Sequence, residues 1–267
     1  MSRRRSRLRS ITLGTVSIAT IVLTLANVEA VQAVTTGIIA GTAGADELIG
    51  TPDDDTINGR GGADVMTGLA GNDTYIVDDE ADQVVEQAGE GADSVRVFGW
   101  YVLPAYVNNL IVAGSQDGGG NGNNLANRMI GNSGSNALNG GPGNDTLTGR
   151  GGRDDFTFNS SLNASTNVDR VTDFTVGVDS LVLWWTVFPA FTRCDGLNAP
   201  DLAPSRLHIG ASATTDSHRI VYNPNSGALS YDSDGSGPTA AVRFATLSPD
   251  LALTGDDFRI LSRTACP

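Results

Sequence analysis

A nine-residue repeat constrains the fold of this chain more than any other feature. From Gly41 the segments GTAGADELI, GTPDDDTIN, GRGGADVMT and GLAGNDTYI follow one another without a gap. Each copy begins with Gly, has Asp at its sixth place and has Leu, Ile, Met or Tyr at its eighth place. A second array in the same register runs from Gly131, and a weaker copy that begins at Gly122 precedes it. A short fixed period is typical of solenoids, in which each repeat packs against its neighbours.

The repeat also predicts a local structure. Gly at the first and fourth places permits positive φ, so each copy is expected to curl tightly and turn carbonyl oxygens inward. The last three places suit a short strand with one inward apolar side chain. We expect Asp53, at a fourth place, to distort its turn. Copies without Gly at the second place, such as those with Arg60, Leu69 and Arg150, tolerate the change if these residues stay in an allowed region.

Two copies form one coil, so residues two copies apart should face each other on neighbouring coils. A sixth-place carboxylate and the inward carbonyls would form an all-oxygen cage, which suits several Ca²⁺ ions and suits Zn²⁺ badly. Asn at the sixth place keeps an oxygen but loses the charge, which predicts weaker sites. The expected facing pairs are Asp46 with Asp64, Asp55 with Asp73, Asn127 with Asp145, and Asn136 with Asp154. The expected metal ligands are the residues of these pairs and the turn glycines Gly44, Gly62, Gly71, Gly143 and Gly152.

Ion binding and folding should be one event, because stacked carboxylates repel one another and the core is too thin to compensate. Extracellular calcium modules bind with a Kd of about 10⁻⁴ to 10⁻³ M, so the chain should fold only outside the cell. A disordered Gly/Asp/Asn linker is the alternative, and the recurring inward apolar residue argues against it.

The pattern Gly-Gly-x-Gly-x-Asp-x-apolar-x, clearest in GGPGNDTLT from Gly140 to Thr148, resembles the RTX, or hemolysin-type, calcium-binding repeat. The stretch from TYIVDD to YVLPAYVNNL resembles the spacer between repeat blocks of serralysin-like proteins, and Leu162–Leu261 resembles the C-terminal domain of serralysin-type metalloproteases. That resemblance implies a mostly β cap and extra Ca²⁺ ligands at Asp169, Asp173 and Asp179. Turn capping by these acids is the alternative.

The expected fold class is therefore all-β, a parallel β-roll or β-solenoid followed by a mostly β C-terminal cap. The predicted parts are a signal peptide over 1–33, a first array over 34–77, a solenoid spacer over 78–121, a second array over 122–158 and a C-terminal β domain over 159–267. Strands are expected in the spacer over 83–86, 93–98 and 107–112, with Trp100 and Tyr101 in the core.

The first 33 residues have the features of a cleavable signal peptide. A basic run ends at Arg9, an uncharged stretch covers 11–26, and small residues favour cleavage after Ala33, with Ala30 second. A permanent anchor is the alternative, but the uncharged stretch is shorter than the roughly 20 residues that a spanning helix needs. We expect a secreted, extracellular bacterial protein without stable membrane insertion after cleavage. Its 257–261 segment resembles the terminal motif of RTX export, yet the leader favours the N-terminal route.

The net charge limits the partners that the chain can bind, and the two cysteines indicate a disulfide. The formal charge is −13, and five of the 17 Arg lie in the leader, so the mature chain is more acidic still. Nucleic acid and anionic membranes are therefore poor partners, and calcium ions are good ones. An extracellular protein or a polysaccharide is a further candidate partner. Cys194 and Cys266 predict one disulfide in an exported protein, with two free thiols as the alternative.

No catalytic motif is recognisable. The chain lacks H-E-x-x-H, G-x-S-x-G and a Walker loop, and its two histidines, His208 and His218, lie ten residues apart. The run Gly118–Gly120 is interpreted as a solenoid turn, and Trp184–Trp185 as core. We therefore predict no enzyme but a structural, adhesive or interaction module. The alternatives are a non-catalytic accessory domain of a secreted hydrolase system and a cryptic glycan-active enzyme.

Overall fold

The computed structural model describes residues 20–25, 28–33, 37–191 and 202–261. Cys194 and Cys266 lie outside these ranges, so the disulfide stays a prediction. Among the described residues no helix is long and apolar enough to cross a membrane.

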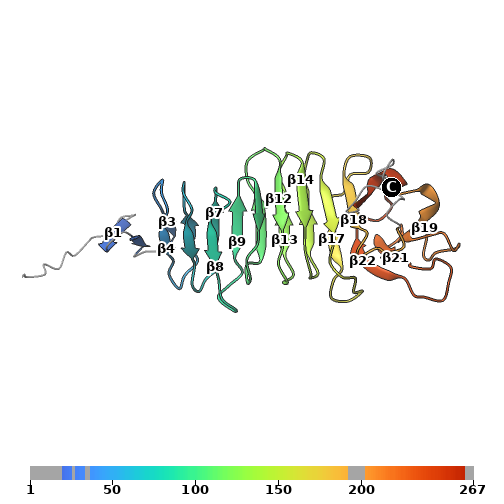
Figure 1. Ribbon diagram of the computed structural model, residues 1–267, viewed down its shortest axis with the longest axis horizontal. Helices are drawn as coiled ribbons and strands as arrows, with labels where there is room; N and C mark the ends of the chain where they lie inside the picture. The colour runs from blue at the N-terminus through green and yellow to red at the C-terminus, as the bar shows by residue number, and fades with distance from the viewer. Residues whose placement is uncertain (1–19, 26–27, 34–36, 192–201, 262–267) are drawn as a thin grey trace, which may run out of the picture.

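The chain winds into an elongated stack of coils that places parallel strands on two opposite faces (Figure 1). One face is a continuous sheet, whose strands in spatial order are β19 (Leu207–Ile209), β20 (Ile220–Tyr222), β21 (Ala228–Tyr231), β22 (Val242–Thr246), β17 (Asp169–Val171), β15 (Thr146–Thr148), β13 (Arg128–Ile130), β11 (Asn109–Val112), β9 (Ser94–Val97), β7 (Thr74–Val77), β5 (Thr56–Asn58) and β3 (Ile38–Ala40). The predicted parallel β-solenoid is confirmed.

The other face consists of two sheets. The first contains β1 (Thr20–Leu25), β2 (Val28–Ala33), β4 (Glu47–Ile49), β6 (Val65–Thr67) and β8 (Gln83–Val85). The second contains β10 (Trp100–Val102), β12 (Gly118–Asn121), β14 (Asn136–Asn139), β16 (Asp155–Phe158), β18 (Ser180–Trp184) and β23 (Phe258–Leu261). This face is therefore interrupted between β8 and β10.

The eighth place of the repeat forms the core. Ile57 pairs in register with Tyr75, and Leu48 pairs with Met66, so identical places stack from coil to coil. These side chains are fully buried, and the hydrophobic core continues without a break through the spacer into the C-terminal strands. The array strands β4, β5, β6 and β15 each bury only one side chain, which leaves the core thin there, as the repeat predicts.

Strands form near the three expected places in the spacer, as β8, β9 and β11, and β10 is added between them. Tyr101 is buried as expected. The core placement of Trp100 is wrong, because its ring is on the outer face of β10 and is 48% exposed. The prediction of a turn at Gly118–Gly120 is also wrong. These residues form most of β12, where Gly119 has φ of 155° and a Cβ would overlap the carbonyl oxygen of Ala137.

The C-terminal strands extend both faces of the solenoid. β22 pairs in parallel with β17, and β23 pairs in parallel with β18. β20 and β21 form an antiparallel hairpin, and the two short 3-10 helices, Pro204–Arg206 and Gly255–Asp257, precede β19 and β23. Phe188, Phe244 and Tyr231 pack edge to face over the last coil. The expected mostly β ending is therefore present.

At the opposite end, β1 and β2 lie inside the segment that the sequence predicts as a signal peptide. β2 pairs in parallel with β4, and β1 pairs antiparallel with β2. Cleavage after Ala33 would remove both strands and leave β4 at the edge of its sheet.

Candidate metal centre

The sixth-place side chains form ladders that link successive coils. The backbone N–H of Asp46 donates to Oδ1 of Asp64 at 2.8 Å. Equivalent bonds join the other three expected pairs, from Asp55 to Asp73, from Asn127 to Asp145 and from Asn136 to Asp154, at 2.7 to 2.8 Å. All eight side chains are at most 6% exposed. The structure therefore brings together the pairs that the sequence predicts.

The ladders continue beyond the arrays. The N–H groups of Asp64 and Asp73 donate to Oδ1 of Asp82 and Asp93. Sequence reasoning missed these two residues, although Asp82 follows Asp64 by the same 18 residues that separate Asp46 from Asp64.

Of the three acids that the serralysin resemblance implied as ligands, two are on the ladders. The N–H groups of Asp145 and Asp154 donate to Oδ1 of Asp169 and Asp179. Asp173 is elsewhere and accepts from the N–H groups of Gly149 and Arg150.

The first-place glycines are required for space and not for positive φ, which corrects the expectation. Gly59 and Gly140 do not have positive φ. A Cβ at either position would overlap Oδ2 of the sixth-place Asp in the same copy, Asp64 or Asp145. The missing side chain therefore makes room for the carboxylate.

The turns fall into two classes according to the second place. We call the first class capped turns, over 41–46, 50–55, 122–127 and 131–136, because Thr or Asn stands at the second place. In the first of them, the N–H and the hydroxyl of Thr42 donate to Oδ2 of Asp46 at 2.5 and 3.0 Å. The chain's own donors therefore occupy Oδ2 of Asp46, so this oxygen does not need an added cation.

Asp53 lies in a capped turn, and the expected distortion there is wrong. Asp53 does not have positive φ, and its N–H donates to the hydroxyl of Thr51 at 3.3 Å. The N–H of Gly44 makes the same bond to Thr42 in the preceding copy. The Thr side chain therefore replaces the left-handed residue that this turn was expected to need.

We call the second class open turns, over 59–64, 68–73, 140–145 and 149–154. Their second-place residues Arg60, Leu69 and Arg150 have φ of 63°, 74° and 72°, so these turns use the left-handed conformation even without Gly at the second place. The N–H of Arg60 bonds Asn58 and that of Arg150 bonds Asp173, instead of the sixth-place Asp. In these turns the fourth-place glycines Gly62, Gly71, Gly143 and Gly152 have positive φ, whereas Gly44 of a capped turn does not.

The open turns leave carboxylate oxygens without a donor. Oδ2 of Asp64, Asp73 and Asp145 is buried and accepts no hydrogen bond. A buried acceptor without a partner costs about 1–3 kcal/mol, and more when it is charged. These oxygens are all hard donors, so the residues present fit a calcium ion and do not fit a metal that prefers nitrogen or sulfur.

The pKa values follow from this burial. Burial raises the pKa of Asp73 and Asp154 to about 6. Burial also raises the pKa of Asp145, and burial together with the charge of Asp145 raises the pKa of Asp169. Each of these carboxyl groups is therefore stabilised by whatever neutralises it, either a proton or a cation.

The asparagines at the sixth place are satisfied without an ion. Nδ2 of Asn127 donates to the carbonyl oxygens of Val107 and Asn108 at 3.1 Å. Nδ2 of Asn136 donates to the carbonyl oxygen of Gly118 at 3.4 Å. Weaker ion binding at Asn127 and Asn136 stays a prediction.

The two histidines, which form no recognisable zinc motif in the sequence, stack with ring centroids 4.6 Å apart. His208 is in β19 and His218 precedes β20, and these strands are parallel neighbours. A transition-metal site needs at least one more ligand beside this pair, and the structure groups no third His, Cys, Asp or Glu with them in the described ranges.

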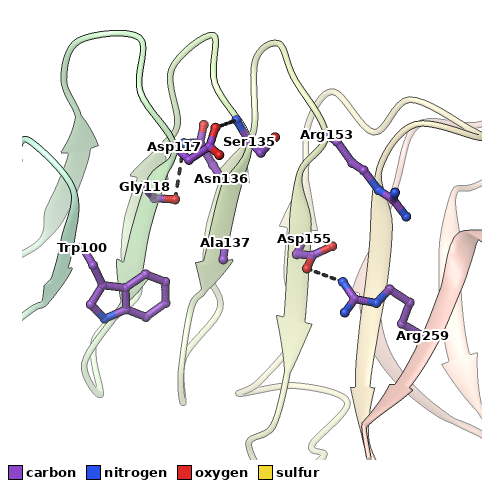
Figure 2. Close-up of a pocket in the computed structure, with 9 residues that line it drawn as sticks. All are labelled: Trp100, Asp117, Gly118, Ser135, Asn136, Ala137, Arg153, Asp155 and Arg259. Atoms are coloured by element: carbon purple, nitrogen blue, oxygen red, sulfur yellow. Dashed lines mark hydrogen bonds and ion pairs between the residues drawn. The ribbon is translucent and has the colours of Figure 1, made fainter. Parts of the chain in front are cut away.

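A groove of about 760 Å³ lies on the outer face of the six-stranded sheet (Figure 2). Trp100, Gly119, Ala137 and Asp155 are neighbours in one row across β10, β12, β14 and β16. Gly119 and Ala137 have almost no side chain, so the floor is low between the Trp100 ring and the ion pair of Asp155 with Arg259 at 2.5 Å. Arg153 lines the same end.

Two comparisons with known proteins bear on the site. The RTX calcium-binding nonapeptide repeat matches the chain in four copies over residues 40–75 and 119–156. No curated protein matches the chain. The matched ranges contain all four open turns and all eight sixth-place residues, so the two arrays of this β-solenoid are similar to RTX calcium-binding nonapeptide repeats.

Proposed function

We propose that this chain is a secreted calcium-binding module that folds on Ca²⁺. The observation that carries the proposal is the set of buried carboxylate oxygens without donors in the open turns, at Asp64, Asp73 and Asp145. The match to a calcium-binding repeat over the same turns supports it.

In this proposal the ions are held on the edges of the coils. Asp64, Asp73, Asp145 and Asp154 supply carboxylate oxygens, and the turns supply backbone carbonyl oxygens. A bound Ca²⁺ supplies positive charge that offsets the repulsion between stacked carboxylates. The residues' own contribution is to bind the ion, to hold successive coils in register through the sixth-place ladder and to exclude water from the thin core.

The proposed role is structural, adhesive or interactive and not catalytic. A leader that ends at Ala33 would send the chain to the extracellular medium, where calcium is abundant enough to fill sites of millimolar affinity. Service as a non-catalytic accessory domain of a secreted hydrolase system is the alternative, and co-purification with a hydrolase distinguishes it.

Isothermal titration calorimetry of the chain from Val34 onward, after chelation, tests calcium binding. We expect saturable Ca²⁺ binding with a Kd of about 10⁻⁴ to 10⁻³ M, and weak or no binding of Mg²⁺, which keeps its waters and demands octahedral geometry. Equal heats for the two ions, or none for either, would contradict the proposal.

The groove supports a second candidate function, binding of an extracellular polysaccharide. An exposed Trp that faces a carboxylate and two guanidinium groups across a low floor offers a ring for stacking and polar groups for hydroxyls. Trp100→Ala should abolish retention of the calcium-loaded chain on a polysaccharide matrix. Val102→Ala removes an equally exposed apolar side chain from the same strand outside the groove and should leave retention unchanged. Equal retention of both variants would exclude the groove as the polysaccharide-binding site.

A further inference from the structure

The loop between β8 and β9 departs from the repeat. In the array, strand partners such as Thr56 and Thr74 are 18 residues apart, whereas Thr74 and Ser94 are 20 residues apart. β8 pairs in register with β6, and Glu86 follows β8 at the point where Gly68 follows β6. A carboxylate side chain therefore stands where the repeat has none.

Glu86 points inward from this loop. Its side chain is 8% exposed, the hydroxyl of Tyr75 donates to its Oε1, and its Oε2 is buried without a partner. Tyr75 itself is unusual, because it is the one tyrosine among the eighth-place residues of the two arrays. Two departures from the repeat pattern therefore contact each other.

Glu86 completes a cluster of three buried acids. Asp73, Glu86 and Asp93 each offer a carboxylate oxygen, and these oxygens lie within 4.8 Å of one another. Asp73 is 1% exposed, and its Oδ2 also lacks a donor. In the part of the chain that the structure describes, no other three His, Cys, Asp or Glu side chains come together in this way. Three carboxylates this close repel strongly out of water, so they need positive charge among them.

We propose that Asp73, Glu86 and Asp93 together hold a divalent cation of the calcium class, in a site that the nonapeptide pattern does not contain. The proposal deepens the calcium-binding function and rests on it in part, because Asp73 belongs to both sets of ligands. Affinity of oxygen sites rises with the charge of the ligands. Three carboxylates should therefore bind the ion more tightly than an open turn does, and this site should fill first.

The position gives the site a structural task. Asp73 precedes β7, Glu86 follows β8 and Asp93 precedes β9, and β8 is the last strand of its sheet before the interruption. An ion at these three residues ties the end of the five-stranded sheet to the sheet that continues on the other face.

Three variants separate an ion site from a simple Tyr–Glu hydrogen bond. Glu86→Gln keeps an oxygen that can accept from Tyr75 and keeps the volume, but removes the charge. Glu80→Gln removes the same charge from an exposed side chain in the loop between β7 and β8 and is the matched control. Tyr75→Phe removes the hydroxyl and keeps the ring.

The probe is Tb³⁺, which prefers oxygen ligands as Ca²⁺ does and emits when a nearby tyrosine is excited. We expect the unchanged chain and Glu80→Gln to show a tyrosine-sensitised emission step at the lowest Tb³⁺ concentrations, and Ca²⁺ to reverse it. In Glu86→Gln this step should need about tenfold more Tb³⁺ or more, because one ligand charge is lost. Tyr75→Phe should lose the sensitised step while its tightest calcium binding, measured by calorimetry, persists.

The outcomes distinguish this site from the general function. If Glu86→Gln titrates like Glu80→Gln while Ca²⁺ still folds both, the three-acid site is wrong and the calcium module stands. If the unchanged chain binds neither Tb³⁺ nor Ca²⁺, both proposals are wrong. If Glu86→Gln does not fold in saturating Ca²⁺, the Tyr75→Phe arm decides, and unchanged sensitised emission in that variant overturns the site.

Discussion

At the scale of single residues, the same amino acid has two different tasks at the same place of the repeat. Oδ2 of Asp46 accepts from the main chain and hydroxyl of Thr42, whereas Oδ2 of Asp64 is buried without a donor. The second-place residue decides between them. An aspartate that its own turn satisfies stabilises the fold, and an aspartate without a donor is available to a cation.

Exchanging Asp for Asn should therefore have a large effect on calcium affinity at Asp64 and a small effect at Asp46. Asp64→Asn places an amide where an oxygen ligand is expected, so calcium affinity should fall about tenfold or more. Asp46→Asn imitates the capped turns that contain Asn127 and Asn136, so affinity should change less than about twofold. Calorimetric titration of both variants checks this, and an equal loss in both would contradict the division into turn classes.

The first-place glycines provide a second residue-scale prediction. Gly59→Ala puts a Cβ against Oδ2 of Asp64 and should destabilise the calcium-loaded fold by about 1–3 kcal/mol, the usual cost of overpacking. Gly61→Ala is the control, because the nearest atom to its Cβ would be 3.8 Å away. Urea unfolding in saturating Ca²⁺ measures both, and equal midpoints would show that space at Gly59 is not limiting.

At the scale of elements, the turns couple folding to pH. In the ion-free fold the pKa of Asp73 and of Asp154 is about 6, above the ordinary value of 3.8. A raised pKa means that the folded state holds the proton more tightly than the unfolded state. The stability that protonation of these two carboxyl groups contributes is therefore fully present below pH 3.8 and is lost as the pH rises through 6.

Protonation of the buried carboxylates at low pH should consequently stabilise the fold in part when calcium is absent. In chelator, the β signal of the ion-free chain should increase when the pH is lowered from about 7.5 to about 5, while calcium affinity falls over the same range because protons and Ca²⁺ compete for the same carboxylates. Far-UV circular dichroism at fixed ionic strength measures the first effect and calorimetry the second. A β signal that decreases steadily on acidification in chelator would contradict this account.

Within the two arrays the sequence was sufficient to predict the strands and their register, because a period of nine with one inward residue permits few arrangements. It was also sufficient for the four facing pairs, which follow from two copies per coil. The division into capped and open turns was not predicted, since it depends on hydrogen bonds that Thr42 and Asn132 make to their own turns. Glu86 was missed because it lies in an insertion, where the period no longer indicates which residues face each other.

At the scale of the whole molecule, the fold has a thin core and an edge lined with buried carboxylates. The core is continuous from β3 to β23. Loss of the ions from one array should therefore also destabilise the coils beyond that array. We therefore expect the stability of the fold to depend on the cations that its surroundings supply.

Export is the first whole-molecule prediction. Secreted protein should begin at Val34, because Val31 and Ala33 provide the small residues that a signal peptidase requires. Intact-mass measurement of the protein in the medium checks the cleavage site, and Ala33→Arg should move it to Ala30. Protein in the medium that still carries Met1 would contradict export by the N-terminal route.

The most direct test of the central claim is a calcium titration of the chain from Val34 onward. The chain is first freed of ions with a chelator, the titration is monitored by far-UV circular dichroism, and Mg²⁺ serves as the control. We predict that β signal appears cooperatively as Ca²⁺ approaches the millimolar range and does not appear with Mg²⁺. An ion-free sample that is already fully folded at neutral pH and indifferent to Ca²⁺ would contradict the account.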